Sequence, residues 1–172
     1  MKVLRHGSPV ALVALMVAVL TALAVAPAAI ADKPTQEIIP APDDIVITGQ
    51  CAFPVLGHIE GVEIDTTFTD KEGNPVKLIG VFPGNTLTLT NLDTGRSITL
   101  VSDGQFHAQL KQDGSGFVLV TGHGPSIPNP ITGEPGIWYL SGRLIARFDA
   151  DGNLTSTNST GNLVNLCVRL ES

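Results

Sequence analysis

Apolar and polar residues alternate along most of the chain from residue 44 onward, a pattern that places successive side chains on opposite faces of a β-strand. Residues 86–90 alternate threonine with leucine, and residues 97–100 repeat the alternation. The Asp-Thr-Gly sequence at 93–95 is typical of a tight turn. The sequence therefore predicts a β-hairpin over residues 86–100.

A second hairpin is predicted directly downstream. Residues 105–111 alternate polar with apolar side chains, and residues 117–120 are all apolar. Between them, residues 113–116 read Asp-Gly-Ser-Gly, which supplies the conformational freedom that a turn requires. We expect the two segments to be neighbouring antiparallel strands.

Two further strands are predicted near the C-terminus. Residues 137–148 alternate over a long stretch, and a polar segment leads from there into a last strand. Strict alternation places four apolar residues of this last strand on one face: Val164, Leu166, Val168 and Leu170. Cys167 then lies on the opposite face, outside the core, unless a β-bulge shifts the register.

The fold class follows from these repeated strands. Strands and glycine-containing turns alternate through the sequence, whereas an apolar i, i+3, i+4 stripe of useful length is absent. The pattern predicts one all-β domain over residues 44–172. We expect a single closed antiparallel β-barrel, because closure leaves no exposed strand edge. A two-sheet β-sandwich is the alternative.

The first 31 residues have the pattern of a secretory signal peptide. Lys2 and Arg5 precede an uncharged apolar run, residues 10–25, and small residues follow it. We expect cleavage after Ala31, with Ala28 as the alternative site. An uncleaved membrane anchor is disfavoured, because the run of 16 residues is shorter than the roughly 20 that cross a bilayer. The sequence therefore predicts a secreted, extracellular protein with no membrane insertion after cleavage.

Residues 32–43 are expected to form a flexible N-terminal tether. They contain three prolines and no periodic pattern. Such a segment is typically extended and mobile.

The charge of the chain restricts its partners. After residue 31 the chain carries eight basic and sixteen acidic residues, a formal charge of −8. A charge of this sign repels polyphosphates, so nucleic acid is excluded as a partner. A small molecule or a cell-surface partner remains, and the sequence leaves the oligomeric state open.

Cys51 and Cys167 are the two cysteines of the chain, and an even count in an exported protein favours a disulfide. Their bridge closes a loop of more than a hundred residues and, in a barrel, sets the first and last strands side by side. A redox or catalytic thiol is the alternative. Neither a Cys-x-x-Cys motif nor a histidine close in sequence supports it.

The sequence gives no support for a metal or a cofactor. The histidines after residue 31, His58, His107 and His123, lack the close spacing that seats a metal on one strand or helix. Residues 149–153, Asp-Ala-Asp-Gly-Asn, resemble a calcium loop, but the glycine and the final acidic ligand are out of place. A hairpin turn explains these residues better.

Two groups of residues are candidates for a ligand site. The first is the irregular segment at 122–136, because long ordered loops on small β-domains often carry function. The groups expected at a ligand there are His123, Glu134, Trp138 and Tyr139. The second is a polar barrel interior formed by His107, Arg143 and Arg147. The two arginines share a strand face and are spaced to hold an anion, with simple solvent exposure as the alternative.

Five segments of the chain carry a family resemblance: residues 51–55, 89–98, 116–122, 142–153 and 161–167. They resemble a group of uncharacterised short secreted proteins of actinobacteria. The resemblance supports export and a disulfide and implies no site residue. In composition and strand rhythm alone, the overall plan is also similar to the barrels of the dirigent and allene oxide cyclase class.

Three functional hypotheses follow. The first is a secreted, non-enzymatic domain that binds a small molecule or a surface partner, since no nucleophile, acid–base pair or metal cluster stands out. The second is a barrel enzyme of the cyclase or isomerase type that uses His107, Arg143 or Arg147 in an apolar cavity. The third is a structural module of the cell envelope.

Overall fold

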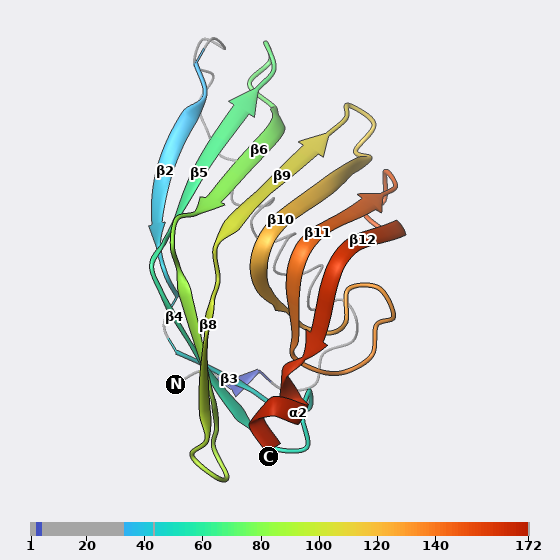
Figure 1. Ribbon diagram of the computed structural model, residues 1–172. Helices are drawn as coiled ribbons and strands as arrows, with labels where there is room; N and C mark the ends of the chain where they lie inside the picture. Colours follow the sequence, from blue (N-terminus) through green and yellow to red (C-terminus); the bar gives the residue numbers. More distant parts are fainter. Residues whose placement is uncertain (1–2, 5–32, 43, 172) are drawn as a thin grey trace.

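The computed structural model describes residues 3–4, 33–42 and 44–171, so most of the predicted signal peptide and its cleavage site lie outside the described residues. The described chain is an all-β fold with one short helix (Figure 1). Its elements are β1 (Val3–Leu4), β2 (Thr35–Pro40), β3 (Ile45–Ile47), β4 (Val55–Glu60), β5 (Val62–Thr69), β6 (Pro75–Phe82), β7 (Thr86–Asn91), β8 (Ser97–Val101), β9 (Gly104–Leu110), β10 (Gly116–Ser126), β11 (Trp138–Phe148), β12 (Leu154–Asn165) and α2 (Leu166–Glu171). Among these residues, no helix has the length and apolar character that crossing a membrane requires.

Seven antiparallel strands form the larger sheet, in the order β12-β11-β10-β9-β6-β5-β2 (Figure 1). β9 and β10 pair as the predicted hairpin, with Phe106 opposite Val120 and Ala108 opposite Val118.

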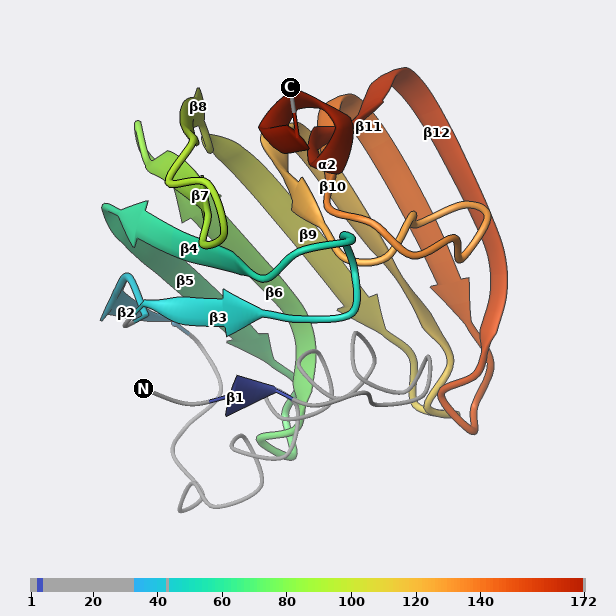
Figure 2. The same cartoon turned by 90° about the horizontal axis from the view of Figure 1, so that it is seen from below.

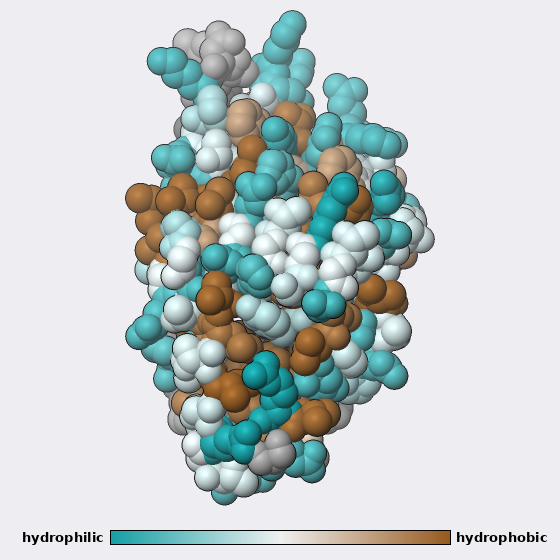
Figure 3. Space-filling model, viewed as in Figure 1, coloured by the Kyte–Doolittle hydropathy of each residue, from teal (hydrophilic) through white to brown (hydrophobic). Residues whose placement is uncertain are grey.

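Hydrophilic and hydrophobic side chains are intermixed on the side of the molecule that faces the reader (Figure 3).

The smaller sheet has the order β1-β3-β4-β7-β8, with β1 parallel to β3 and the other neighbours antiparallel. The predicted hairpin of β7 and β8 is confirmed, since Leu87 lies opposite Leu100 and Thr88 lies opposite Thr99. The leucines face the core, and the two threonine hydroxyls lie 2.9 Å apart on the other side.

Short connections carry the chain from one sheet to the other. β4 is followed by β5 after Gly61, and β8 is followed by β9 after residues 102–103. In Figure 2, β3, β4 and β7 form a group separate from β10 to β12. The described strands do not close a barrel, because β12 and β2 end the seven-stranded order without pairing to each other. The all-β prediction is confirmed with two sheets, and the closed barrel is not.

A row of glycines crosses the larger sheet beside the β8–β9 connection. Gly104, Gly122, Gly142 and Gly161 are in register across β9 to β12. Each has a φ between 117° and 148°, and a Cβ on any of them would collide with the backbone of the adjacent strand. Only glycine accepts these angles together with so close an approach, which explains its recurrence in four consecutive strands.

The most deeply buried core lies between the smaller sheet and α2. Six side chains in it are at most 3% exposed: Val55, Leu87, Leu89, Ile137, Leu166 and Leu170. Each buried aliphatic side chain of this size contributes about 1.5–3 kcal/mol, so the cluster is a major source of stability at this end of the molecule.

Residues 166–171 form α2 instead of the predicted end of the last strand. β12 ends at Asn165, whose side-chain oxygen accepts a hydrogen bond from the Cys167 backbone N–H at 2.9 Å, the contact of a helix N-cap. Leu166 and Leu170 both enter the core, whereas Val168 is 64% exposed. A spacing of four residues fits two strand repeats as well as about one helical turn, so the leucine pattern alone could not separate the two structures.

Replacing Asn165 by alanine removes this cap, and we expect the free energy of unfolding to fall by about 1 kcal/mol. Asn162→Ala, at an exposed position of the same strand, is the matched control and should change it by less than about 0.5 kcal/mol. Urea denaturation followed by circular dichroism measures both variants. Equal losses would contradict the capping role.

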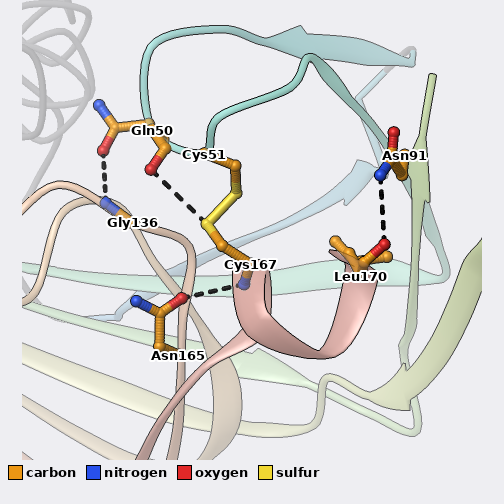
Figure 4. Close-up of a disulfide and its surroundings, with 7 residues drawn as sticks. All are labelled: Gln50, Cys51, Asn91, Gly136, Asn165, Cys167 and Leu170. Carbon is orange, nitrogen blue, oxygen red and sulfur yellow. Dashed lines mark hydrogen bonds between the residues drawn. A yellow bond between two sulfur atoms is a disulfide. The ribbon is translucent and has the colours of Figure 1, made fainter. Parts of the chain in front are cut away.

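Cys51 and Cys167 form the predicted disulfide, with their Cα atoms 5.4 Å apart (Figure 4). Cys51 lies between β3 and β4, Cys167 lies in α2, and both pack against the core. The bridge therefore holds α2 to the smaller sheet, and the Asn91 side-chain amide adds a hydrogen bond to the Leu170 carbonyl at 3.2 Å. Of the two alternatives for Cys167, a position outside the core is wrong, and the start of α2, instead of a β-bulge, turns the cysteine towards the core. The expectation that the bridge sets the first and last strands side by side is also wrong, since Cys51 lies in a connection and Cys167 in the helix.

Residues 35–40 form β2 instead of part of a flexible tether. They pair with residues 62–67 of β5 along their whole length. All six are exposed, and Pro40 ends a strand at the edge of the sheet, where the missing N–H of a proline is tolerated. The flanking prolines interrupt the alternation that would have indicated this strand.

Candidate functional site

The register of the larger sheet divides its side chains between two faces. One, here named the outer face, carries the exposed side chains of Lys77, Gln109 and Arg147 among half-buried apolar residues such as Phe117 and Leu119. The other, the inner face, is defined by seven half-buried apolar residues: Leu78, Phe106, Ala108, Val118, Val120, Leu144 and Ala146. The inner face is thus a continuous apolar surface across β6, β9, β10 and β11.

The residues predicted to form a polar interior lie on the outer face. Arg143 and Arg147 are exposed, and His107 is half-buried. Ile145 lies between the two arginines on β11, and Leu119 separates it from His107 in the register. The three residues share a face, as alternation predicted, but they do not converge in a cavity.

Two of the four residues predicted at the ligand loop come together. The rings of His123 and Tyr139 stack with their centroids 6.2 Å apart. Glu134 is exposed at the loop tip, where it accepts a hydrogen bond from the Thr132 hydroxyl at 3.1 Å. The Trp138 indole N–H is buried and donates no hydrogen bond to the described residues.

Asp103 and Val101 fix the stacked pair at the junction of β8 and β9. Asp103 Oδ1 lies 2.9 Å from His123 Nδ1, and the Tyr139 hydroxyl donates to the Val101 carbonyl at 2.8 Å. Burial, together with the charge of Asp103, raises the pKa of Tyr139. Because its proton is engaged and its ionised form is disfavoured, Tyr139 is unsuited to proton transfer, and the cluster is best explained as a structural contact.

Three acidic residues that the sequence pattern did not single out lie on the inner face. Glu37 of β2 is opposite Asp65 of β5, and Glu63 lies two residues from Asp65 on the same strand. Asp65 is opposite Gly80 of β6, which in turn is opposite Phe106 of β9. The sheet therefore places three carboxyl groups at one side of the apolar surface.

Asp65 is buried without a full set of hydrogen bonds. Its side chain is 8% exposed in a sheet position, and its Oδ1 accepts no hydrogen bond from the described residues. Gly80 provides the space for this arrangement: a Cβ at that position would collide with the Phe106 ring and lie 2.8 Å from Asp65 Oδ1. The Asp65 carboxyl and the Phe106 ring thus meet above a glycine.

Burial makes both carboxyl groups of β5 weak acids. Burial, and then the charge and hydrogen bond of Asp65, raises the pKa of Glu63 to about 7. Burial also raises the pKa of Asp65; a hydrogen bond with Glu63 opposes the shift, and the charge of Glu37 adds to it. A carboxyl group such as Glu63, whose pKa is raised to about 7 beside an apolar surface, is a frequent feature of functional sites.

Charge is segregated between the two faces of the larger sheet. Every acidic residue within its strands lies on the inner face: Glu37, Glu63 and Asp65. The basic side chains and histidines of the same strands lie on the outer face: Lys77, His107, His123, Arg143 and Arg147. The inner face is therefore apolar with an acidic end.

The third histidine lies elsewhere, at the exposed side of the smaller sheet. His58 Nδ1 is 2.6 Å from Asp44 and Nε2 is 3.6 Å from Glu60, and the hydrogen bond to Asp44 is the main cause of its raised pKa. Among the described residues, no group of three or more histidine, cysteine, aspartate or glutamate side chains could hold a metal ion.

Residues 149–153 form the hairpin turn that the sequence favoured over a calcium loop. The Asp149 carboxylate accepts hydrogen bonds from the backbone N–H groups of Asp151 and Asn153 at 3.0 and 2.8 Å. These contacts, led by those of Asn153, lower the pKa of Asp149. The carboxylate therefore closes the turn.

Comparison with known proteins gives no relative: no family model, curated protein or solved structure matches the chain. The geometry of the inner face is consequently the basis for assigning a function.

Proposed function

We propose that this protein is an exported, non-enzymatic binding domain that takes a small apolar molecule on the inner face of its larger sheet. The observation that carries the proposal is the apolar surface of β6, β9, β10 and β11 with a buried, under-bonded carboxyl group at its end. Ligand sites are typically lined by apolar side chains, with a few polar groups that orient the ligand. The disulfide is consistent with work in an oxidising compartment.

A neutral fluorescent probe, N-phenyl-1-naphthylamine, tests this site. We expect its fluorescence to rise on binding, and Val120→Gln to weaken the affinity at least about ten-fold by placing an amide on the inner face. Leu119→Gln is the matched control, because Leu119 is the half-buried neighbour on the opposite face of the same strand. Equal weakening by both variants, or no binding by the unchanged protein, would contradict the proposal.

One observation favours an enzyme as the second candidate. The pKa of Glu63, raised to about 7 by burial and by Asp65, suits a group that transfers protons near neutral pH. The enzyme hypothesis then depends on Glu63 instead of His107 and the two arginines. Ligand recovered from the protein should be incubated with fresh protein and analysed by mass spectrometry: conversion that Glu63→Gln abolishes would favour the enzyme, and unchanged ligand would favour binding alone.

A further inference from the structure

The acidic end of the inner face indicates the chemical class of the ligand. Building on the proposed function, we propose that the ligand is an apolar organic cation. Its ammonium group binds at Glu63 and Asp65, with Glu37 alongside, and its apolar body lies along the inner face.

The three carboxyl groups favour a positively charged ligand. None of the three forms a salt bridge with a described residue, and the basic side chains of the sheet point to the opposite face. Asp65 is 8% exposed and retains an oxygen without a hydrogen-bond donor among the described residues. A buried carboxylate that keeps an unsatisfied oxygen and has no cationic partner is unfavourable. A bound cation removes this cost by neutralising the charge, which an anion or a neutral molecule does not do.

Aromatic rings beside the carboxyl groups suit an ammonium group of low hydration. The Phe106 ring lies against Asp65 above Gly80, and its centroid is 6.1 Å from that of Phe82. Organic cations are attracted to the faces of aromatic rings as well as to carboxylates. The combination favours a substituted ammonium over a metal ion, which requires several oxygen ligands at short distance.

The apolar rows define the body of the ligand. Asp65, Gly80, Phe106, Val120 and Leu144 follow one another in register from β5 to β11. Neighbouring strands are about 4.8 Å apart, so this row extends for roughly 19 Å. A decyl chain attached to an ammonium group fits within this length.

Three compounds with the same decyl chain and different charges test whether the site prefers a cation over a neutral or an anionic ligand. The protein is expressed from the full-length coding sequence and loaded with N-phenyl-1-naphthylamine at pH 8. Its affinities for decyltrimethylammonium, decanol and decanoate are then measured by displacement of this probe. We expect the cation to bind at least about ten-fold more tightly than either of the others. Glu63→Gln and Asp65→Asn should each remove most of this preference, so that the cation and decanol bind with similar affinities. Glu60→Gln, which neutralises an exposed carboxylate of the smaller sheet, should keep it.

The preference should also depend on pH. Burial, then Asp65, raises the pKa of Glu63 to about 7, and burial raises that of Asp65. Glu37 of β2 is the other titratable group that faces them, and the adjacent β6 presents Gly80 and Phe82 to this face. Lowering the pH from 8 to 5 protonates Glu63, so the affinity for decyltrimethylammonium, whose charge is permanent, should fall at least about ten-fold, while that for decanol stays constant.

The possible outcomes distinguish a failure of this inference from a failure of the proposed function on which it rests. If the probe and decanol bind but the cation has no advantage, or if the advantage survives both carboxyl substitutions, the inference is overturned and the apolar site stands. Displacement of the cation by micromolar calcium would likewise overturn it in favour of a metal site. If the probe itself does not bind, the proposed function fails first.

Discussion

Replacing both cysteines, as Cys51→Ser with Cys167→Ser, is expected to lower the free energy of unfolding by about 3–5 kcal/mol. The bridge joins residues separated by 116 positions, so its loss returns a large loop-closure entropy to the unfolded chain. It also releases α2, which supplies two of the most buried side chains of the core, Leu166 and Leu170. Guanidinium denaturation of the unchanged protein and the double variant measures the difference.

Reduction provides the control for this experiment. A reductant should shift the denaturation midpoint of the unchanged protein towards that of the double variant, and it should leave the double variant itself unaffected, because the described chain has no free cysteine. A double variant that stays within about 1 kcal/mol of the unchanged protein would show that the core holds α2 without covalent help.

The strands that the sequence predicted most clearly are those with one covered face. In β7, threonine and leucine alternate because the leucines enter the core and the threonines face away from it. The turn of residues 93–95 and the hairpin of β9 and β10 were predictable for the same reason, since turn residues separate alternating segments. The even cysteine count, together with the predicted export signal, predicted the disulfide.

The two errors at the chain ends have local causes. β2 is an exposed edge strand between prolines, so it lacks both the alternation and the composition of a covered strand. α2 begins after Asn165, whose side chain caps the helix by accepting a hydrogen bond from the Cys167 N–H. An asparagine at this position was the sequence feature that could have indicated the start of a helix. The leucines at 166 and 170 fit either structure, and only the burial of both on the same side of one turn decides between them.

The carboxyl groups of the proposed site were not predicted, because alternation shows which residues share a face and not which face is covered. His107, Arg143 and Arg147 were grouped correctly on one face, but the two arginines are exposed and His107 is half-buried. Glu63 and Asp65 alternate with apolar residues in β5, where the usual interpretation places carboxylates in solvent. Only the pairing of β5 with β6, and of β6 with β9, brings Asp65 against Gly80 and the apolar surface.

The covalent anchor and the proposed site lie in different parts of the fold. The disulfide, α2 and the most buried side chains belong to the end formed with the smaller sheet. The carboxyl groups lie on β2 and β5, at one edge of the larger sheet. This separation lets stability and binding be altered independently, so a substitution at Glu63 should report on the site without disturbing the core.

The domain is expected to be more stable at pH 5 than at pH 8, which reverses the usual behaviour of a carboxyl group. Burial and Asp65 raise the pKa of Glu63 from 4.5 to about 7 in the folded state. The stability that this group contributes is therefore complete below about pH 4.5 and is lost as the pH rises through 7. The full shift corresponds to about 3 kcal/mol, and solvent screening of a half-buried side chain reduces the expected change to about 1–2 kcal/mol.

Glu63→Gln isolates this contribution, because glutamine resembles the protonated acid at every pH. The variant should be about 1–2 kcal/mol more stable than the unchanged protein at pH 8 and equal to it at pH 5. The pKa of His58 is raised mainly by Asp44, so this histidine also makes the fold more stable at low pH. The contribution of Glu63 is therefore the difference between the pH dependence of stability in the unchanged protein and that in Glu63→Gln. Glu60→Gln should retain the dependence. If Glu63→Gln destabilises the fold at pH 8, the carboxylate has a partner at that pH, and Glu63 cannot be the weak acid described here.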